Sequence, residues 1–513
     1  MNLNPKHRLD NLNNPKTFLD HIEELKVKNQ AVSHNEVLLH LLDQVDPINF
    51  QTLAYPDEYE TLKKELEEAS HNEKDQIQKK LESLKICSKH YIVLSIDHIL
   101  SLAKENNWAL CKNNNFIYAY NGTYWAEIDI ELFQKFLGEA AEKMGVPLFS
   151  ARHFQFREQL FKQFLATAYL PYPHANQEKV LINLLNGTFE ISHKEIQLRE
   201  FDDSDFLTYQ LPFPYDPEAE APIFEEFLNR VLPNKQIQKV LAEYLGYVFI
   251  RNGSKILKEE KALILHGTGA NGKSVFFEIV NSLLGSQNVS NFSLQSLTNE
   301  TGYYRAKIGN KLLNYASEIN GKLETALFKQ IVSGEPVEAR LPYGQPFILR
   351  NYAKLIFNSN ELPKDVEQTA AFFRRFLIIP FEITIPEEEQ DKNLHTKIIE
   401  NELSGVFNWV LEGLKRLLEQ KRFTKCEAID KAVNDYKLSS DSVKMFLTEN
   451  QYTPSLSNEI LLKIMYQEYK VYCLEGGFRP CNSRTFTNRI KQSGFDTHRK
   501  SLGYVVFGEK KYL

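Results

Sequence analysis

Residues 266–274 read HGTGANGKS, a stretch too small and too rich in glycine to fill a hydrophobic core. The apolar run Ala262–Leu265 precedes it, and a helical pattern of apolar residues follows it and stops at Gly285. The stretch meets the pattern G-x-x-x-x-G-K-[ST] in the strand–loop–helix setting that confirms this phosphate-binding motif. The sequence therefore predicts an α/β domain whose glycine loop holds phosphate.

Each residue type in this loop has a physical reason. Glycine lets backbone N–H groups approach phosphate oxygens without interference from a Cβ atom, and the following helix adds a positive dipole. We expect Lys273 to reach the β- and γ-phosphates and Ser274 to bind a metal ion. The predicted cofactors are ATP and Mg²⁺, and the predicted binding residues are Gly267, Thr268, Gly269, Ala270, Asn271, Gly272, Lys273 and Ser274. The plain alternative is a glycine-rich turn that binds nothing.

Three further features follow the loop in chain order. KLLNYASE (311–318) ends in Glu318, a carboxylate that would face Mg²⁺ and the attacking water. AKLIFNSN (353–360) ends in Asn360, whose amide is suited to sensing the γ-phosphate. The last feature is an arginine pair, Arg374 and Arg375, directly before a fourth predicted strand. These arginines would stabilise transition-state charge at a nucleotide bound to a neighbouring subunit. Each has a plain reading as a surface acid, a turn asparagine or a surface arginine pair.

The order of these motifs between residues 241 and 381 resembles superfamily 3 helicases, in particular the phage and plasmid primase-helicase branch that includes the poxvirus primase-helicase. The resemblance implies an AAA+ ATPase fold, a hexameric ring and 3′ to 5′ movement along single-stranded DNA. It also implies a Walker A motif on the glycine loop and three further roles: a Walker B acid, a sensor asparagine and an arginine finger, at Glu318, Asn360, and Arg375 or Arg374. More loosely, the likeness extends over about residues 90 to 510.

A hairpin is predicted at VEARLPYGQPFILR (337–350), where two extended pieces surround Pro342, Tyr343 and Gly344. In the family that the chain resembles, such a hairpin lines the pore of the ring and grips DNA, and relatives often carry a lysine near its tip. Here a tyrosine at the tip would stack on bases, or alternatively would pack against its own hairpin. The predicted DNA contacts of this region are Lys329, Arg340, Tyr343 and Gln345.

Four regions are predicted from composition and charge. Residues 1–90 are helical, and the charged stretch 57–85 is expected to form a solvated helical hairpin, or alternatively to dock a partner protein. Residues 91–230 mix short strands with Asn-Gly turns and end in a proline-rich connector. Residues 231–424 alternate strands and helices, which indicates the ATPase domain.

The fourth region, 425–513, is predicted to be a winged-helix DNA-binding domain, with helices at 459–475 and 482–494 and two strands around a turn at 500–503. Between Arg484 and Lys511, seven lysines and arginines stand against two acids, which favours phosphate contact. The alternative is that this domain packs against the ring or another protein. Its predicted DNA contacts are Arg484, Asn488, Lys491, Arg499 and Lys500.

Two sets of possible metal ligands are expected to be structural instead. The acids of FDDSDF (201–206) lack the companion residues of a primase site, so a polar loop is expected. The spacing of Cys473, Cys481 and His498 does not fit the common closed zinc sites. No two of the five cysteines stand at C-x-x-C spacing, which favours a reduced compartment.

Composition bounds the remaining possibilities. The chain has 513 residues, of which 42% are hydrophobic and 25% charged, as is usual for soluble globular proteins. The net charge of −6 argues against a surface that coats nucleic acid throughout. No uncharged apolar run reaches the roughly 18 residues of a membrane helix, and no signal core is present at the start. A cytoplasmic protein without a membrane partner is expected.

The function predicted from these features is that of an ATP-dependent DNA helicase of a phage, plasmid or mobile element. It would act as a homo-hexameric ring on single-stranded and forked DNA, beside a primase or replication protein on a separate chain. Three alternatives stay open. They are a primase-helicase with its own polymerising site, a small-molecule kinase, and a non-enzymatic initiator that binds a replication origin.

Overall fold

The computed structural model describes residues 32–113, 116–168, 178–192, 196–317, 319, 323–363, 366–501 and 503–510. The chain divides into two compact units, Met1–Tyr215 and Asp216–Leu513, and the division falls inside the proline-rich connector. It lies earlier than the predicted boundary at residue 230 because helix α11 (Pro222–Val231) belongs to the second unit. There the Glu402 carboxylate accepts hydrogen bonds from the backbone N–H groups of Ile223 and Phe224, each at 2.9 Å.

The first unit is built around a helical core. The core contains buried side chains from α3 (His34–Gln44), α7 (Ser88–Glu105), α8 (Ile130–Lys143), α9 (Leu148–Arg152) and α10 (Phe154–Thr167). Because α3 and α7 share this core, the predicted boundary at residue 90 does not separate two folded parts. The short helix α4 (Phe50–Ala54) leads from the core to the charged stretch.

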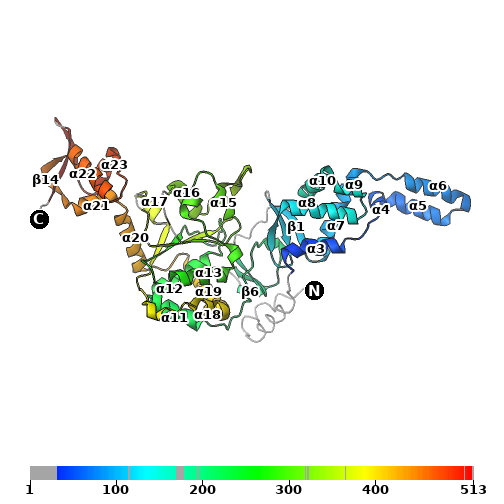
Figure 1. The fold of residues 1–513 in the computed structure, drawn as a ribbon, viewed down its shortest axis with the longest axis horizontal. Coiled ribbons are helices and arrows are strands. Elements are labelled where there is room, and N and C mark those ends of the chain that lie inside the picture. Colours follow the sequence, from blue (N-terminus) through cyan, green and yellow to red (C-terminus); the bar gives the residue numbers. More distant parts are fainter. Residues whose placement is uncertain are drawn as a thin grey trace. The chain divides into compact units, whose positions relative to one another are not determined.

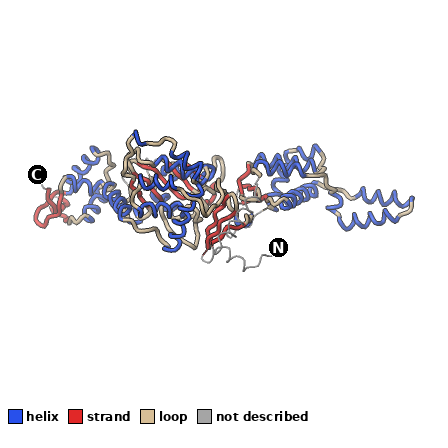
Figure 2. Tube along the Cα trace, turned by 90° about the horizontal axis from the view of Figure 1, so that it is seen from below, coloured by secondary structure: helices blue, strands red, loops and turns tan. Residues whose placement is uncertain are grey.

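The charged stretch forms two adjacent helices, α5 (Pro56–Glu68) and α6 (His71–Ser83). No side chain of α5 is buried. Figure 2 shows this pair of helices extending away from the helical core of its own unit. The predicted solvated hairpin is confirmed.

Two antiparallel sheets complete the first unit. One contains β1 (Ala109–Asn113), β2 (Phe116–Tyr120) and β3 (Trp125–Ile128), and the other β4 (Lys179–Leu184), β5 (Gly187–Ser192) and β6 (Ile196–Arg199). The predicted Asn-Gly pairs lie at the turns between β2 and β3 and between β4 and β5.

The acids of FDDSDF have structural partners in this unit. The Arg199 guanidinium contacts both carboxylate oxygens of Asp205, at 2.8 and 2.7 Å. Asp202 accepts a hydrogen bond from the backbone N–H of Ser204 at 2.9 Å and so caps a turn. The predicted polar loop is therefore confirmed.

The second unit contains a parallel sheet of five strands in the order β13-β7-β12-β9-β8. The strands are β7 (Ala262–His266), β8 (Val289–Ser290), β9 (Leu313–Ala316), β12 (Lys354–Ser359) and β13 (Phe376–Pro380). Helices cover the two faces of this sheet (Figure 1). They include α11, α12 (Lys235–Tyr247), α13 (Lys273–Leu284), α18 (Leu394–Asn401) and α19 (Leu403–Gln420), as well as α14 (Leu294–Leu297), α15 (Tyr303–Lys307), α16 (Thr325–Val332) and α17 (Ala370–Phe373). The α/β fold class is confirmed.

The predicted hairpin is present as β10 (Val337–Arg340) and β11 (Pro346–Leu349), paired in antiparallel register from Val337↔Leu349 to Arg340↔Pro346. Val337 and Ala339 are buried, whereas Glu338 and Arg340 are exposed, so one face of β10 packs and the other meets solvent. Together these strands form a separate small sheet beside the parallel one.

A further group of elements ends the chain: α20 (Glu427–Ser439), α21 (Ser442–Glu449), β14 (Tyr452–Leu461), α22 (Leu462–Glu475), α23 (Ser483–Gln492), β15 (Thr497–Lys500) and β16 (Gly503–Lys510). The two predicted helices and the hairpin are present. The prediction that a helix begins at residue 459 was wrong, because Glu459, Ile460 and Leu461 pair with β16 and end a strand. Among the described residues, no helix combines the length and apolar character needed to cross a membrane.

Candidate nucleotide-binding site

The glycine loop leaves the carboxyl end of a central, buried strand. Strand β7 pairs with β12 on one side and β13 on the other, and its first four residues are fully buried. This explains why the strand reads as a continuous apolar run. The loop has positive φ at Gly269, Ala270 and Gly272, and α13 begins directly after it at Lys273. Helix α13 therefore directs its N-terminal N–H groups toward the loop.

The start of the loop requires glycine because other groups lie too close to Gly267 to leave room for a Cβ atom. A Cβ atom on Gly267 would overlap the side-chain amide of Asn271 and the carbonyl oxygen of Phe381. Those two groups are themselves hydrogen-bonded, with the Asn271 amide donating to Phe381 at 3.0 Å. The segment after β13 thus fixes the position of the loop.

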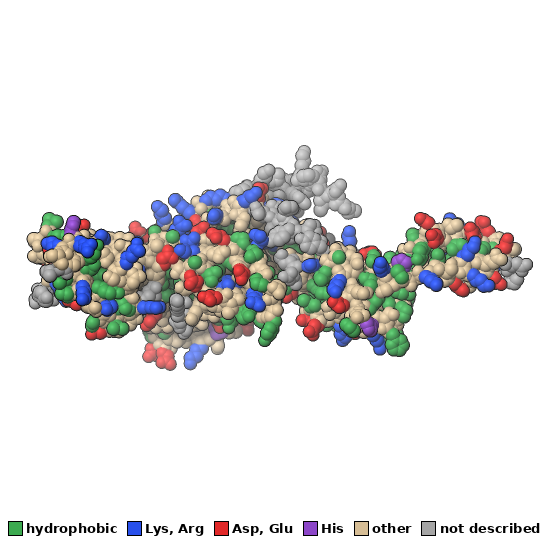
Figure 3. Space-filling model, turned by 90° about the horizontal axis from the view of Figure 1, so that it is seen from above, with side chains coloured by type: hydrophobic (Ala, Val, Ile, Leu, Met, Phe, Trp, Pro, Cys, Tyr) green, Lys and Arg blue, Asp and Glu red, His purple; other side chains and the backbone are tan. Residues whose placement is uncertain are grey.

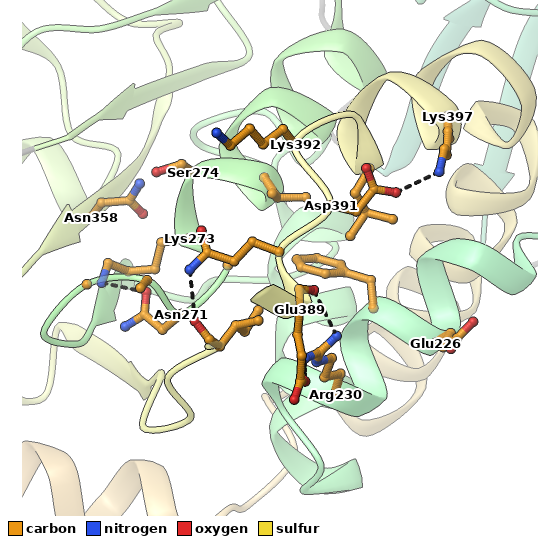
Figure 4. A pocket seen from close by; sticks show the side chains of 18 of the residues that line it. Glu226, Arg230, Asn271, Lys273, Ser274, Asn358, Glu389, Asp391, Lys392 and Lys397 are labelled. Carbon is orange, nitrogen blue, oxygen red and sulfur yellow. Dashed lines mark hydrogen bonds and ion pairs between the residues drawn. The ribbon is translucent and has the colours of Figure 1, made fainter. Parts of the chain in front are cut away.

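Lys273 carries the central charge of the site. Its side chain is only 7% exposed, and its ammonium donates to the carbonyl of Gly267 at 2.7 Å and to Oδ1 of Asn271 at 3.0 Å (Figure 4). Burial lowers the pKa of Lys273, and among the described residues no carboxylate forms an ion pair with it. A buried cation with neutral partners alone is electrostatically suited to an anionic ligand. The residues of this loop therefore fit a phosphate group.

A cavity of about 780 Å³ opens at the carboxyl edge of the sheet. Its lining includes the glycine loop and, from neighbouring strands, Ser317, Asn358 and Asn360. They meet there because the carboxyl ends of parallel strands lie at one edge of a sheet. Asn358 is buried and accepts a hydrogen bond from the hydroxyl of Tyr315 at 3.0 Å, whereas Asn360 is exposed at the rim.

Of the two predicted metal ligands, Ser274 and Glu318, the structure describes only Ser274. Ser274 lines the cavity in the first turn of α13. Glu318 lies outside the described residues, although the preceding residue, Ser317, lines the cavity.

The opposite wall of the cavity was not predicted from the sequence. It is formed by α11, by the segment between β13 and α18, and by α18 itself. Two ion pairs join residues of this wall: Arg230 with Glu389, and Lys397 with Asp391 at 2.6 Å (Figure 4). No motif marks these residues, because they lie in a helix surface and a loop. Asn358 was also missed, although it stands two residues before Asn360, directly after the apolar run Leu355–Phe357.

The arginine pair lies at the other edge of the sheet. The carbonyl of Arg375 accepts a hydrogen bond from the backbone N–H of Ala262 at 2.8 Å, at the start of β7. Since β13 runs parallel to β7, the arginines are about 15 Å along the strands from the glycine loop. Neither lines the cavity.

The two arginines differ in burial. Arg375 is 8% exposed, with its guanidinium 3.2 Å from Glu260 and donating to the Ser333 hydroxyl at 2.9 Å. Arg374 is exposed and lies 3.4 Å from Glu260. The side chain of Arg375 is held inside the unit, whereas that of Arg374 is accessible.

The predicted DNA-contacting residues near the hairpin differ in exposure and in their bonding partners. Tyr343 is fully exposed at the tip with φ of 60°, so the alternative that it packs against its own hairpin was wrong. Gln345 is exposed, and Arg340 donates to the carbonyl of Gly344 at 2.9 Å. Lys329 forms an ion pair with Glu367 at 2.9 Å, which neutralises its charge.

The C-terminal elements expose most of the predicted basic residues. Helix α23 buries Phe486 and Ile490, and on its outer surface Arg484, Asn488 and Lys491 are exposed. Arg499 is exposed on β15, while Lys500 forms an ion pair with Glu459. Figure 3 shows lysine and arginine side chains on the visible face of this part of the chain.

The C-terminal cysteines are structural. Cys473 is fully buried in the hydrophobic core of these elements, and Cys481 accepts a hydrogen bond from the hydroxyl of Tyr469 at 3.3 Å. Throughout the part of the chain that the structure describes, no three His, Cys, Asp or Glu residues are grouped so as to hold a metal ion.

Comparison with known proteins finds two family models on this chain. Residues 89–233 match the family described as "D5 N terminal like", and residues 265–375 match a family of unknown function (DUF5906). The second match begins just before the glycine loop and ends at the arginine pair. Neither match covers half of the chain.

One curated relative is a protein of Acanthamoeba polyphaga mimivirus that is named a "Putative helicase". It is 23% identical over 245 residues, which are 44% of this chain and 24% of the mimivirus protein. The chain thus spans about a quarter of the length of this relative. Among solved structures, the apo A form of the NrS-1 C-terminal region has 13% identity and a TM-score of 0.47, over 79% of this chain and 97% of that one. Another apo structure of the same region has 14% identity and a TM-score of 0.44, over 82% of this chain and 99% of that one.

Proposed function

We propose that this chain is an ATP-driven DNA helicase that acts in the replication of a phage, plasmid or other mobile element. The observation that carries the proposal is the buried ammonium of Lys273, which lies on the glycine loop with neutral partners at the mouth of a cavity of about 780 Å³. The match to the "D5 N terminal like" family and the similarity to a mimivirus protein named a helicase support the DNA-directed part of the proposal.

In this proposal each residue at the cavity has one role. Lys273 holds the phosphates of ATP, and Ser274 and Glu318 hold the Mg²⁺ that would neutralise charge developing on them. Asn360 lies at the rim and positions water or the γ-phosphate, while the buried Asn358 supports that edge of the strand.

The arginine pair requires a second copy of the chain. Because the arginines lie at the edge of the sheet away from the glycine loop, neither can reach ATP bound to its own chain. We propose that Arg374, the exposed member, completes the site of a neighbour in an AAA+ ring of the superfamily 3 type, expected to be a hexamer. Arg375 instead holds β13 to Glu260 and Ser333.

DNA binding is assigned to two regions. The exposed Tyr343 would stack on bases inside the ring, with Arg340 and Gln345 beside it, and Lys329 would contribute little while paired with Glu367. The C-terminal elements would act as a winged helix, with α23 in a DNA groove and Arg499 and Lys500 near phosphate. A separate primase would act beside this chain.

An ATPase assay with and without single-stranded oligo-dT tests the proposal. Wild type should hydrolyse ATP faster with DNA, and Lys273→Ala should lose at least 100-fold in rate, because a charge on the transferring phosphate goes unpaired. The control is Lys425→Ala, an exposed lysine that does not line the cavity. ATP hydrolysis that ignores DNA would favour a small-molecule kinase, and DNA binding without hydrolysis would favour an origin-binding initiator.

A further inference from the structure

One part of the cavity wall is a segment whose backbone is hydrogen-bonded to the glycine loop and to the end of the strand before it. This bridging segment, residues 381–393, begins where the backbone N–H of Phe381 donates to His266 at 2.7 Å. Further along, the N–H of Ile385 donates to the carbonyl of Ala270 at 2.8 Å. Together with the bond from Asn271 to Phe381, these contacts make the position of the bridging segment depend on the backbone of the loop.

Both acids of the bridging segment that line the cavity have cationic partners. Glu389 forms an ion pair with Arg230 of α11, and Asp391 forms one with Lys397 of α18 at 2.6 Å. Asp391 also accepts a hydrogen bond from the backbone N–H of Asn393 at 2.9 Å, through its other oxygen. Both carboxylates are thus engaged by other cations, and the residue that follows Asp391 is Lys392.

Lys392 is exposed and lines the cavity, and among the described residues its ammonium has no ion pair or hydrogen bond. Figure 4 shows its side chain extending from the bridging segment toward Ser274, at the N-terminal turn of α13. In a glycine loop of this type, the serine would hold the metal ion that neutralises charge on the last phosphates. The ammonium of Lys392 is therefore on the side of the cavity where the last phosphates would lie.

We propose that Lys392 is a second phosphate-binding lysine that contacts the terminal phosphate of ATP; this inference rests on the proposed function. A lysine is suited to the task because its ammonium is a compact charge on a flexible stem. Lys273 supplies one charge from the loop, whereas the triphosphate carries several. Through Lys392 the bridging segment distinguishes ATP from ADP.

The bridging segment that contains Lys392 is also connected to the helices around the cavity. The bridging segment continues into α18, and Glu402, directly after that helix, binds the N-terminus of α11. Helix α11 in turn forms part of the cavity wall and is joined to the bridging segment by the pair Arg230–Glu389. A change at the terminal phosphate thus acts on a closed set of contacts around the cavity.

Calorimetric titration of the full-length chain with ATPγS and with ADP, both with Mg²⁺, tests the inference. We expect Lys392→Met to bind ATPγS about tenfold more weakly, because one charge-assisted hydrogen bond is lost, and to bind ADP within about twofold of wild type. Lys392→Arg should restore most of the affinity for ATPγS. Lys425→Met is the matched control, since it removes a lysine that does not line the cavity.

Each other result overturns the inference in a recognisable way. Equal weakening of ATPγS and ADP would mean that Lys392 supports the fold or the general field of the cavity rather than the terminal phosphate. Unchanged binding of both nucleotides by Lys392→Met would remove Lys392 from the site while leaving the proposed function intact. A wild-type chain that binds neither nucleotide would overturn the proposed function itself, and this inference with it.

Discussion

The two edges of the parallel sheet in the second unit differ in the kind of charge that they present. At the carboxyl edge, Lys273 is buried among neutral acceptors beside a cavity. At the amino edge, Arg375 is buried against the carboxylate of Glu260, and Arg374 next to it is exposed. The first edge holds a cation that lacks an anionic partner among the described residues, and the second holds a buried cation that already has one.

The partners of a buried charge indicate whether that charge is a candidate for chemistry or for structure. A buried cation with a carboxylate partner contributes to structure, because breaking the pair leaves a charge uncompensated. A buried cation with neutral partners is suited to a ligand. By the same criterion Arg374, exposed and weakly held, is free to act on another chain, whereas Arg375 is not.

The largest effect is expected at Arg374. Arg374→Ala should lower the turnover number for ATP about 10³-fold while nucleotide affinity stays near that of wild type, because in the proposed ring this arginine would act on transition-state charge in a neighbouring site. Steady-state hydrolysis and ATPγS titration measure the two quantities. Arg422→Ala, which removes another exposed arginine, should behave as wild type. Loss of nucleotide affinity in Arg374→Ala would argue for a role within its own chain.

Arg375 should matter for stability instead. Arg375→Met leaves the Ser333 hydroxyl without this donor and removes the buried one of the two arginines that pair with Glu260, so the free energy of unfolding should fall by about 2 kcal/mol. Urea denaturation followed by circular dichroism provides the value, with Arg374→Met as the neighbouring control. A stable Arg375→Met chain that fails only in hydrolysis would exchange the roles of the two arginines.

A third region, the tip of the β10–β11 hairpin, is expected to affect DNA binding and not the ATPase site. Tyr343→Ala should weaken binding of fluorescent oligo-dT about tenfold, since stacking of one aromatic ring on a base contributes about 1 to 3 kcal/mol. Tyr343→Phe should retain the affinity, because it keeps the ring. Hydrolysis of ATP without DNA should not change in either variant. If Tyr343→Ala binds DNA as tightly as wild type, the tip is not a stacking platform.

The smallest effect is expected at His266, which ends β7 at the carboxyl edge. Burial, together with the charge of Lys273, lowers the pKa of His266 below its ordinary value of 6.5, against a hydrogen bond to the backbone of Asn360 that raises it. Below about pH 6.5, His266 therefore takes up a proton more readily in the unfolded chain than in the folded chain. The free energy of unfolding should fall as the pH drops through this range. His266→Asn should lose less stability than wild type between about pH 7.5 and pH 5.5. Thermal unfolding at both pH values measures this, and equal losses would contradict it.

Local sequence patterns predicted the elements that carry the motifs. The apolar run before Gly267 and the apolar stripe after Lys273 determine a buried strand and an amphipathic helix on their own, and both are present. The exposed charged hairpin α5–α6 also follows from local pattern, because its two helices are adjacent to each other and α5 buries no side chain.

Long-range contacts decided the rest. The boundary at residue 215 depends on Glu402 binding α11 from nearly two hundred residues away. The separation of the arginine pair from the glycine loop depends on the parallel register of β13 with β7. Lys392 lies in a loop that follows no motif, and only the folded bridging segment places it in the cavity. Propensity and spacing contain no information on such contacts.

In the proposed ring, the carboxyl edge of one chain and the amino edge of another form one ATPase site. Mixing Lys273→Ala chains with Arg374→Ala chains tests it directly, because each variant retains the residue that the other lacks. We expect the mixture to hydrolyse ATP, in the presence of oligo-dT, faster than the sum of the two variants measured separately. Hydrolysis by the mixture that only equals this sum, while wild type is active, would contradict a site shared between two chains.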